Sequence, residues 1–499
     1  MSENRSTLSG KVKRYAKVSS KLTTVSARIA GKKLIGKQDD TKDAELLLNA
    51  LGGLKGPLMK VAQLLSTVPD LLPKEYADKL QQLQSDAPSM GTFFVKRRMR
   101  SELGINWQKK FDYFNNEASK AASLGQVHKA KSGNIDLACK LQYPNMMSTV
   151  DADLKQLKLM FSLYGTWDKT IKTDEIYTEL SQRLKEELDY KRELKNMLLY
   201  GEILKNENFI NVPKPIKKLS TDRLLSMTWL EGTPLMAWKE SDQEIRNHIA
   251  KILFNAWYIP FYKYGIIHGD PHPGNYQICN SSKRKPSLNL LDFGCIRIFP
   301  SSFVGGVIDL YKAIRDNNEE LAVKAYRAWG FKNLNKEIID ILHIWATYIY
   351  GPLIDNKKRF IQDNDTTKNG KEIASGVYKE LKKLGGIAPP KEFVMIDRAA
   401  VGLGSVFMHL NAKLNWHKIL EEMISDFDEK VLSNRQKSIL ENVKIIKGEP
   451  DFADTKMTKN GRSSYPISFI ENHVSSGFID KNPKNIIMLK QRKICIPKF

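Results

Sequence analysis

The sequence has few cysteines and no long apolar segment. The four cysteines are scattered and form no Cys-x-x-Cys pair: Cys139, Cys279, Cys295 and Cys495. This excludes a disulfide scaffold and a structural zinc site as organising features, and it indicates a reducing compartment. The longest apolar run, residues 341–354, contains His343 and is interrupted by Gly351-Pro352, so no transmembrane helix is predicted.

Acidic residues are missing from a basic segment near the start of the chain. Residues 4–37 contain ten Lys or Arg and no Asp or Glu, and apolar residues recur at roughly helical spacing from Val12 to Ile29. The segment lacks the apolar core of a secretory signal. Three interpretations remain open: a basic helix that binds a membrane surface, a mitochondrial transit peptide, and a solvated tail.

The whole chain of 499 residues carries a formal net charge of +23. Such a surplus attracts phosphates, anionic lipid or nucleic acid. Because no basic stripe with interleaved aromatic residues is present, nucleic-acid binding is not predicted. An anionic membrane surface is the favoured partner, bound peripherally, since each basic side chain near anionic lipid contributes about 1 kcal/mol.

The order of helix-like and strand-like patterns divides the chain into five parts. Strand patterns occur at 111–142 and 223–229, and helical patterns at 149–206 and after Gly232. The predicted parts are a basic N-terminal segment (1–40), a helical extension (41–105), an N-lobe (106–231), a C-lobe with helical elaboration (232–445) and an irregular C-terminal extension (446–499).

Two short loops carry the strongest signal for chemistry. Residues 268–275 read His-Gly-Asp-Pro-His-Pro-Gly-Asn, and Asp292-Phe293-Gly294 follows. This is the layout of the catalytic and metal-binding loops of protein-kinase-like phosphotransferases. In that layout Asp270 is the base or positioning carboxylate, while Asn275 and Asp292 supply oxygen ligands to Mg²⁺.

The residues around Asp270 modify this prediction. Gly269 stands where most protein kinases have the arginine that receives activation-loop phosphate, so activation by phosphorylation is not expected. His268 and His272 are expected to support the loop rather than to bind metal, because Mg²⁺ prefers oxygen ligands.

Lys140 lies within a short apolar strand pattern, residues 135–141. It could simply end an exposed strand, or it could contact the α- and β-phosphates of a nucleotide and pair with a helix glutamate. The succession of strand, lysine, acidic helix, hinge and catalytic loop favours the second interpretation. Among the acidic residues of 186–193, which are predicted to lie in one helix, Glu193 is the expected partner.

An alanine-rich segment precedes Lys140 at the position where kinases have a glycine-rich loop. Backbone N–H groups of such a turn can hold phosphate oxygens, and alanine in place of glycine makes the turn stiffer. The predicted nucleotide contacts here, in addition to Lys140, are Ala121, Ala122, Ser123, Gly125, Gln126 and Val127.

Over residues 20–415 the sequence resembles the UbiB family of atypical kinase-like proteins, which is linked to ubiquinone (coenzyme Q) biosynthesis. The resemblance rests on the alanine-rich loop, the His-Gly-Asp-x-His-Pro-Gly-Asn loop, Glu187-Leu188-Asp189 and Lys60-Val61-Ala62-Gln63. In the last element Ala62 replaces the family's glycine. The resemblance implies an α+β, atypical protein-kinase-like two-lobed fold with a helical N-terminal extension and a helical C-terminal elaboration.

The resemblance also implies roles for residues before the N-lobe. The extension would cover the site where a protein kinase binds its peptide, with Lys60 and Gln63 directed toward Glu187 and Asp189. Family members are associated with membrane-stimulated ATP hydrolysis rather than with established protein phosphorylation.

We therefore expect an ATPase that binds ATP or ADP and Mg²⁺ and supports ubiquinone biosynthesis, with lipid quinone precursors and biosynthetic enzymes as partners. The alternatives are a small-molecule or lipid kinase and a nucleotide-switched scaffold. High Lys, Asn and Ile usage suggests a bacterial protein, cytoplasmic and peripheral on the inner membrane; the matrix side of a mitochondrial membrane is the alternative.

Overall fold

The fold is that of a computed structural model, which describes residues 90–443 apart from several short gaps. The gaps are 123, 145, 149, 152–153, 156–157, 159–172, 282–283, 332–333, 362–372, 374–375, 378–379 and 382–390. The predicted basic segment, the Lys60 to Gln63 element and the predicted C-terminal extension lie outside the described residues.

The described residues fall into two compact units. The first contains the residues up to Glu193 together with Pro215–Trp229, and the second contains Leu194–Lys214 together with the residues from Leu230 onward. The first unit lacks 194–214 and 230–231 of the predicted N-lobe, 106–231, and it also contains residues 90–105.

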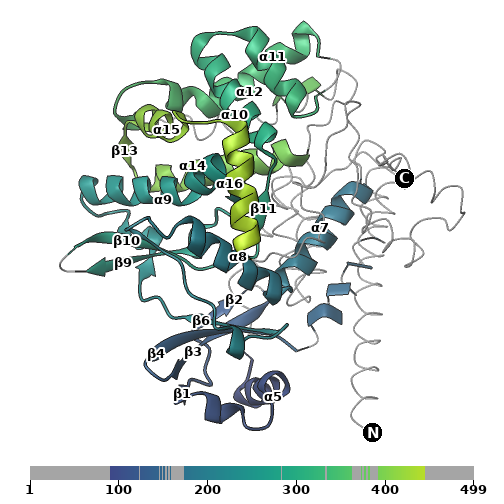
Figure 1. Ribbon diagram of the computed structural model, residues 1–499, viewed down its shortest axis with the longest axis vertical. Helices are drawn as coiled ribbons and strands as arrows, with labels where there is room; N and C mark the ends of the chain where they lie inside the picture. The colour runs from purple at the N-terminus through teal and green to yellow at the C-terminus, as the bar shows by residue number, and fades with distance from the viewer. Residues whose placement is uncertain are drawn as a thin grey trace, which may run out of the picture. The chain divides into compact units, whose positions relative to one another are not determined.

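The first unit is built on a five-stranded antiparallel sheet (Figure 1). The strands are β1 (Tyr113–Phe114), β2 (Lys120–Ala122), β3 (Gly125–Ser132), β4 (Ile135–Gln142) and β6 (Leu224–Thr228). Their order is β1-β3-β4-β6, and β2 pairs with β3. The antiparallel strands that the sequence predicts at 111–142 are thus present, joined between β3 and β4 by a turn at Gly133, whose φ is +59°.

Helix α5 (Thr92–Leu103) and the short helix η2 (Trp107–Lys110) pack on this sheet. Val95 and Met99 of α5 are fully buried, in one apolar cluster with Trp107, Leu137 and Cys139. Val95 and Met99 are four residues apart, so they lie on the same face of the helix. This face fixes how α5 sits on the sheet.

Two helices, α7 (Thr173–Glu187) and α8 (Tyr190–Ile203), occupy the acidic segment for which a single helix is predicted. The prediction of one helix is wrong because Asp189 starts a new one: its Oδ1 accepts the backbone N–H of Arg192 at 2.9 Å. An aspartate in this position is a favoured helix N-cap. The buried Gln142 donates to the carbonyl of Leu188 at 2.6 Å and so holds the break in place.

The second unit contains three small sheets. The first has the order β5-β10-β9-β7, the second pairs β8 with β11, and the third pairs β12 with β13. The strands are β5 (Ile210–Asn211), β7 (Thr233–Pro234), β8 (Ile266–His268), β9 (Tyr276–Ser281), β10 (Arg284–Leu290), β11 (Ile296–Ile298), β12 (Arg359–Phe360) and β13 (Lys413–Leu414).

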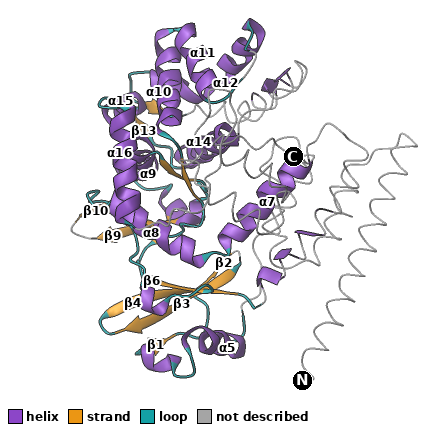
Figure 2. Ribbon diagram, turned by 45° about the vertical axis from the view of Figure 1, so that its right-hand side comes forward, coloured by secondary structure: helices purple, strands orange, loops and turns teal. Residues whose placement is uncertain are grey.

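Most of the second unit is helical (Figure 2). Its α-helices beyond α8 are α9 (Gln243–Tyr264), α10 (Ser301–Asp316), α11 (Glu319–Ala328), α12 (Lys336–Ile354), α14 (Lys391–His409), α15 (Trp416–Ile424) and α16 (Glu429–Asn442). Side chains cap the first turns of α11, α12, α15 and α16, namely Asn318, Asn335, Asn415 and Asp428. No helix in the described part of the chain is both long and apolar enough to cross a bilayer.

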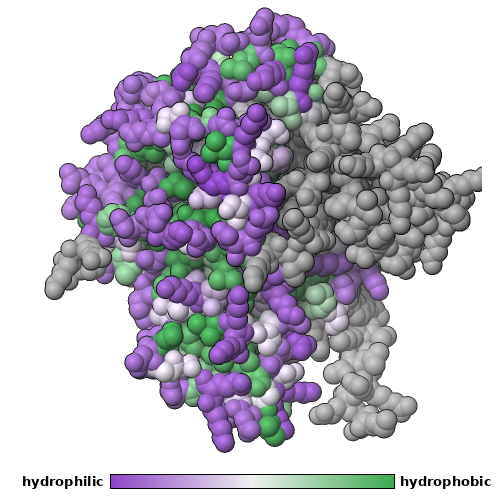
Figure 3. Space-filling view, viewed as in Figure 1, coloured by the Kyte–Doolittle hydropathy of each residue, from purple (hydrophilic) through white to green (hydrophobic). Residues whose placement is uncertain are grey.

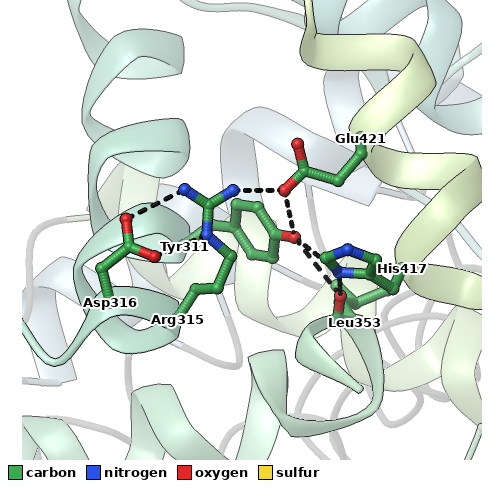
Figure 4. Close-up of polar contacts among 6 residues, drawn as sticks. All are labelled: Tyr311, Arg315, Asp316, Leu353, His417 and Glu421. Atoms are coloured by element: carbon green, nitrogen blue, oxygen red, sulfur yellow. Dashed lines mark hydrogen bonds and ion pairs between the residues drawn. The ribbon is translucent and has the colours of Figure 1, made fainter. Parts of the chain in front are cut away.

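A polar network ties three of these helices together (Figure 4). Tyr311 of α10 donates to Glu421 of α15 at 2.7 Å, and Arg315 donates to the same carboxylate oxygen at 2.5 Å. His417 Nδ1 lies 3.0 Å from the carbonyl of Leu353 in α12 and 3.2 Å from the Tyr311 hydroxyl. Burial alone would raise the pKa of Glu421, but the hydrogen bonds from Tyr311 and Arg315 outweigh it and lower that pKa.

Helix α16 closes the turn that leads into β8. Gln436 is buried, and its Nε2 donates to the carbonyls of Tyr264 at 2.7 Å and Phe299 at 2.9 Å. Gly265 lies between these groups in the left-handed conformation, with φ +66°, and a Cβ there would be 2.6 Å from both Gln436 Nε2 and Phe299 O. Only glycine fits this position without displacing its neighbours.

We predict that Gly265→Ala lowers the free energy of unfolding by more than about 2 kcal/mol, since it adds a steric clash to the cost of a left-handed alanine. The control is Gly133→Ala, because Gly133 has a similar φ of +59° and nothing within 4 Å of its Cβ position. Urea denaturation should show a loss of about 1 kcal/mol for the control. Equal losses for the two variants would contradict the proposed packing of Gln436.

Candidate functional site

Strands β8 and β11 carry the two loops with the catalytic motif residues. The strands pair antiparallel with His268 opposite Ile296, and the backbone N–H of Gly269 donates to the carbonyl of Cys295 at 2.5 Å. The chain therefore leaves β8 after His268 and enters β11 at Ile296 at the same end of this two-stranded sheet. Asp270 and Asp292 both lie just beyond that end.

His268 connects the two loops through both of its ring nitrogens. Its Nδ1 accepts the backbone N–H of Asp270 at 3.1 Å, and its Nε2 donates to the backbone carbonyl of Asp292 at 2.8 Å. Because one partner is a donor and the other an acceptor, the ring must be neutral with its proton on Nε2. The ring is buried against Tyr200 and Trp257, which holds its orientation.

Asp270 and Asn275 are fixed within the first loop. Asp270 Oδ1 accepts the backbone N–H of His272 at 3.2 Å, and Asn275 Nδ2 donates to the backbone carbonyl of Asp270 at 3.3 Å. The backbone carbonyl of Asn275 in turn accepts the N–H of Leu291 at 3.0 Å. Because the amide nitrogen of Asn275 makes this bond, its amide oxygen is the atom that could bind a cation.

The Asp-Phe-Gly turn is held from two sides. Asp292 Oδ1 accepts the backbone N–H of Gly294 at 3.0 Å, and Asn196 of α8 donates to the carbonyl of Phe293 at 2.8 Å. Phe293 is fully buried against Tyr200, with ring centroids 5.7 Å apart. The Asp292 side chain itself is only half-buried and so is accessible to a ligand.

The donor atoms in these loops suit a hard cation. Burial is the main reason that the pKa of Tyr276 is raised, and the negative charges of Asp270 and Asp292 raise it further. The described residues hold no cluster of three His, Cys, Asp or Glu side chains that could bind a metal alone. Oxygens of Asp292 and Asn275 fit Mg²⁺ as partial ligands, with phosphate and water completing the shell.

Lys140 and Glu193 form the pair that the sequence predicts. In the first unit, Lys140 Nζ on β4 lies 2.6 Å and 2.9 Å from the two carboxylate oxygens of Glu193. Glu193 is buried, and the ammonium also lies 5.3 Å from the centre of the Tyr190 ring. Removing one partner would leave a buried charge uncompensated, which is strongly destabilising.

The alanine-rich segment forms a tight β2–β3 hairpin, with Ala121 opposite Gln126 and Ala122 opposite Gly125. A Cβ on Gly125 would lie 2.4 Å from the carbonyl oxygen of Leu141, so this close approach of two strands requires glycine. Val127 pairs with Lys140 across β3 and β4. Ser123 lies outside the described residues.

The side chain of Gln126, one of the predicted nucleotide contacts, faces the interior. It is fully buried; its Oε1 accepts the N–H of Met90 at 2.7 Å, and its Nε2 lies 2.9 Å from His128 Nε2. Any nucleotide contact from Gln126 must therefore use its backbone. His128 is also fully buried and donates from Nδ1 to the carbonyl of Asn115 at 2.8 Å.

Of the residues assigned by resemblance, Glu187 ends α7 and Asp189 caps α8. Their expected partners, Lys60 and Gln63, lie outside the described residues, so this part of the site stays a prediction. Sequence reasoning missed the roles of Asn196 and Gln142. The sequence signal that could have pointed to them is an amide side chain next to apolar residues.

Comparison with known proteins relates the chain to a protein family. An ABC1 atypical kinase-like domain matches residues 82–326. This match and the curated relatives support membership of the UbiB family of atypical kinase-like proteins. A second family model, phosphoenolpyruvate carboxykinase, matches residues 426–497, of which the structure describes 426–443.

Curated relatives of this chain include mitochondrial atypical kinases. The coq-8 protein of Caenorhabditis elegans is 26% identical over 77% of this chain and 51% of its own length. COQ8 of Saccharomyces cerevisiae is 30% identical over 52% of this chain and 51% of its own length. The chain thus spans about half the length of these relatives.

A solved structure shares the fold. It is the complex of Rv3197 with erythromycin from Mycobacterium tuberculosis, which is 24% identical and has a TM-score of 0.54 over 80% of this chain and 98% of that one. The predicted α+β, atypical kinase-like fold is therefore confirmed.

We predict a pH-dependent stability from His128. Burial lowers its pKa despite the bond to the Asn115 carbonyl, so the folded state binds fewer protons than the unfolded state. The neutral, buried His128 contributes fully to the free energy of unfolding at pH values above its unfolded pKa of about 6.5. As the pH falls below about 6.5, this contribution is lost, by up to about 1.4 kcal/mol per pH unit. Between pH 6.5 and 5, His128→Gln should lose stability less steeply than the wild type in urea denaturation. Identical slopes would contradict this assignment.

Proposed function

We propose that this chain binds adenine nucleotide with Mg²⁺ and hydrolyses ATP, in support of ubiquinone biosynthesis at a membrane surface. The observation that carries the proposal is the bridge from His268 to the backbones of Asp270 and Asp292. A hydrogen-bonded link between these two loops pre-organises the groups that would meet a nucleotide's phosphates.

Each residue of the site has one role in this proposal. Asp292 and Asn275 would hold Mg²⁺, which when bound neutralises phosphate charge. Lys140, oriented by Glu193, would bind the phosphates nearer the nucleoside. Asp270, held by the N–H of His272, would orient water and accept its proton.

The surroundings of Gly269 argue against activation by phosphorylation of the kind that many protein kinases use. A Cβ at this position would lie 2.8 Å from Cys295 Sγ and 3.0 Å from its carbonyl oxygen. A larger residue would have to displace Cys295, which follows the Asp-Phe-Gly turn. The loop therefore has no room for the arginine that links a protein kinase's catalytic loop to activation-loop phosphate.

The biological role is inferred from relatives. Proteins named COQ8 match the kinase-like part of this chain, and the family resemblance links such proteins to ubiquinone biosynthesis. With a net charge of +23, peripheral contact with an anionic membrane is favoured. We propose that ATP turnover supports extraction or presentation of lipid quinone precursors to biosynthetic enzymes there, on the cytoplasmic face of a bacterial inner membrane or, alternatively, on the mitochondrial matrix side.

The direct test is ATP turnover by purified protein with and without liposomes that contain cardiolipin. We expect slow turnover that the liposomes stimulate, and a fall of about 100-fold or more for Asp292→Asn and Asp270→Asn. The matched control is Asp309→Asn on α10, whose carboxylate pairs with Lys324 at 2.9 Å, away from the two loops. The proposal would be contradicted if Asp292→Asn hydrolysed ATP as fast as the Asp309→Asn control.

The same variants separate the alternatives. If phosphate appears on an added lipid or small-molecule acceptor in proportion to the ATP consumed, the chain is a kinase. If the Asp270→Asn protein still binds nucleotide and restores ubiquinone synthesis in a deficient cell, the chain is a nucleotide-switched scaffold.

A further inference from the structure

Helix α5 presents two aromatic side chains to solvent at its first turn. Phe93 is 71% exposed and Phe94 is 49% exposed, and their rings meet edge to face with centroids 5.7 Å apart. Single exposed apolar residues are ordinary on a protein surface, whereas adjoining exposed rings form an apolar patch that indicates a binding surface.

Basic residues share the outward face of α5 with these rings. Arg97 and Arg100 follow Phe93 by four and seven residues, so all three lie along one stripe of the helix, with Lys96 beside it. Lys96, Arg97 and Arg100 are all exposed. This stripe is opposite the buried face made by Val95 and Met99.

The positive charge of this face is not neutralised within the described part of the chain. Lys96, Arg97 and Arg100 form no ion pair there. Glu102, the acidic residue of α5, is instead directed inward, where Arg98 lies 3.5 Å and Arg223 2.9 Å from its carboxylate. The helix therefore hides its negative charge and exposes its positive charges.

Because Val95 and Met99 are fully buried, α5 cannot rotate to cover its phenylalanines without emptying part of the core of the first unit. The hydropathy surface shows apolar residues among hydrophilic ones in the lower part of the view, where α5 is drawn (Figures 1 and 3). The aromatic and basic residues are thus held outward together.

We infer that the outward face of α5 docks this protein on an anionic bilayer. Phe93 and Phe94 would enter the boundary between headgroups and acyl chains, where aromatic rings are favoured. Lys96, Arg97 and Arg100 would lie at the level of the lipid phosphates. A helix face is convex, so it suits a deformable apolar layer better than a rigid protein partner, which would need a matching groove. This inference rests on the proposed membrane location and names the surface responsible.

The test is co-sedimentation of the full chain with phosphatidylcholine vesicles that contain cardiolipin, compared with phosphatidylcholine alone. We expect Phe93→Ser with Phe94→Ser to weaken binding about 10-fold or more. Replacing Lys96, Arg97 and Arg100 by Gln should weaken it about 100-fold, and salt should weaken wild-type binding too.

Matched controls remove the same chemistry elsewhere. Ile344→Ser removes a side chain that is 56% exposed on α12, and Lys418→Gln with Lys430→Gln and Lys437→Gln removes three exposed charges from the second unit. Both controls should bind the vesicles like wild type. Equal losses in controls and α5 variants would overturn the inference, because binding would then follow overall composition rather than this face.

The inference would also be overturned if both α5 variants bound the vesicles as tightly as the wild type. If deletion of residues 1–37 then abolished vesicle binding, docking would be assigned to the basic N-terminal segment. ATP turnover without vesicles separates this failure from failure of the proposed function. It should be unchanged in the α5 variants, since α5 carries none of the proposed catalytic residues.

Discussion

The geometry of the candidate site depends on one imidazole ring. His268 accepts a hydrogen bond from the backbone of Asp270 and donates one to the backbone of Asp292, and only the neutral form with its proton on Nε2 can do both. Burial of the ring among Tyr200 and Trp257 keeps it in this orientation. Two loops that are 22 residues apart in the sequence therefore act as one rigid feature.

Helix α8 supplies the second constraint. Glu193 in its first turn binds Lys140, and Asn196, three residues later, binds the carbonyl of Phe293. The helix begins where it does because Asp189 caps it and Gln142 holds the preceding residue, Leu188. Glu193 makes its contact within the first unit, and Asn196 makes its contact within the second.

The sequence was sufficient to predict the kinase-like fold, the antiparallel strands at 111–142 and the Lys140–Glu193 pair, because each has a local pattern. It could not predict the break before α8 or the burial of Gln126. Asp189 is a local signal for the break, but the bond from Gln142 that holds the break in place, and the bond between Gln126 and Met90, 36 residues away, join parts of the chain that no local pattern connects. The space around Gly269 is likewise set by Cys295, a contact that no local pattern records.

The measurement that most directly tests the account is the affinity of the purified chain for ADP by isothermal titration calorimetry, with Mg²⁺ and with EDTA. If Asn275 and Asp292 are cation ligands, Mg²⁺ should tighten binding by about 10-fold or more, and Asn275→Ala should remove most of this gain. Lys140→Met should weaken binding in both buffers, because its contact is with phosphate rather than with the metal. Equal ADP affinity with Mg²⁺ and with EDTA in the wild type would contradict the assignment of these loops to a metal–nucleotide site.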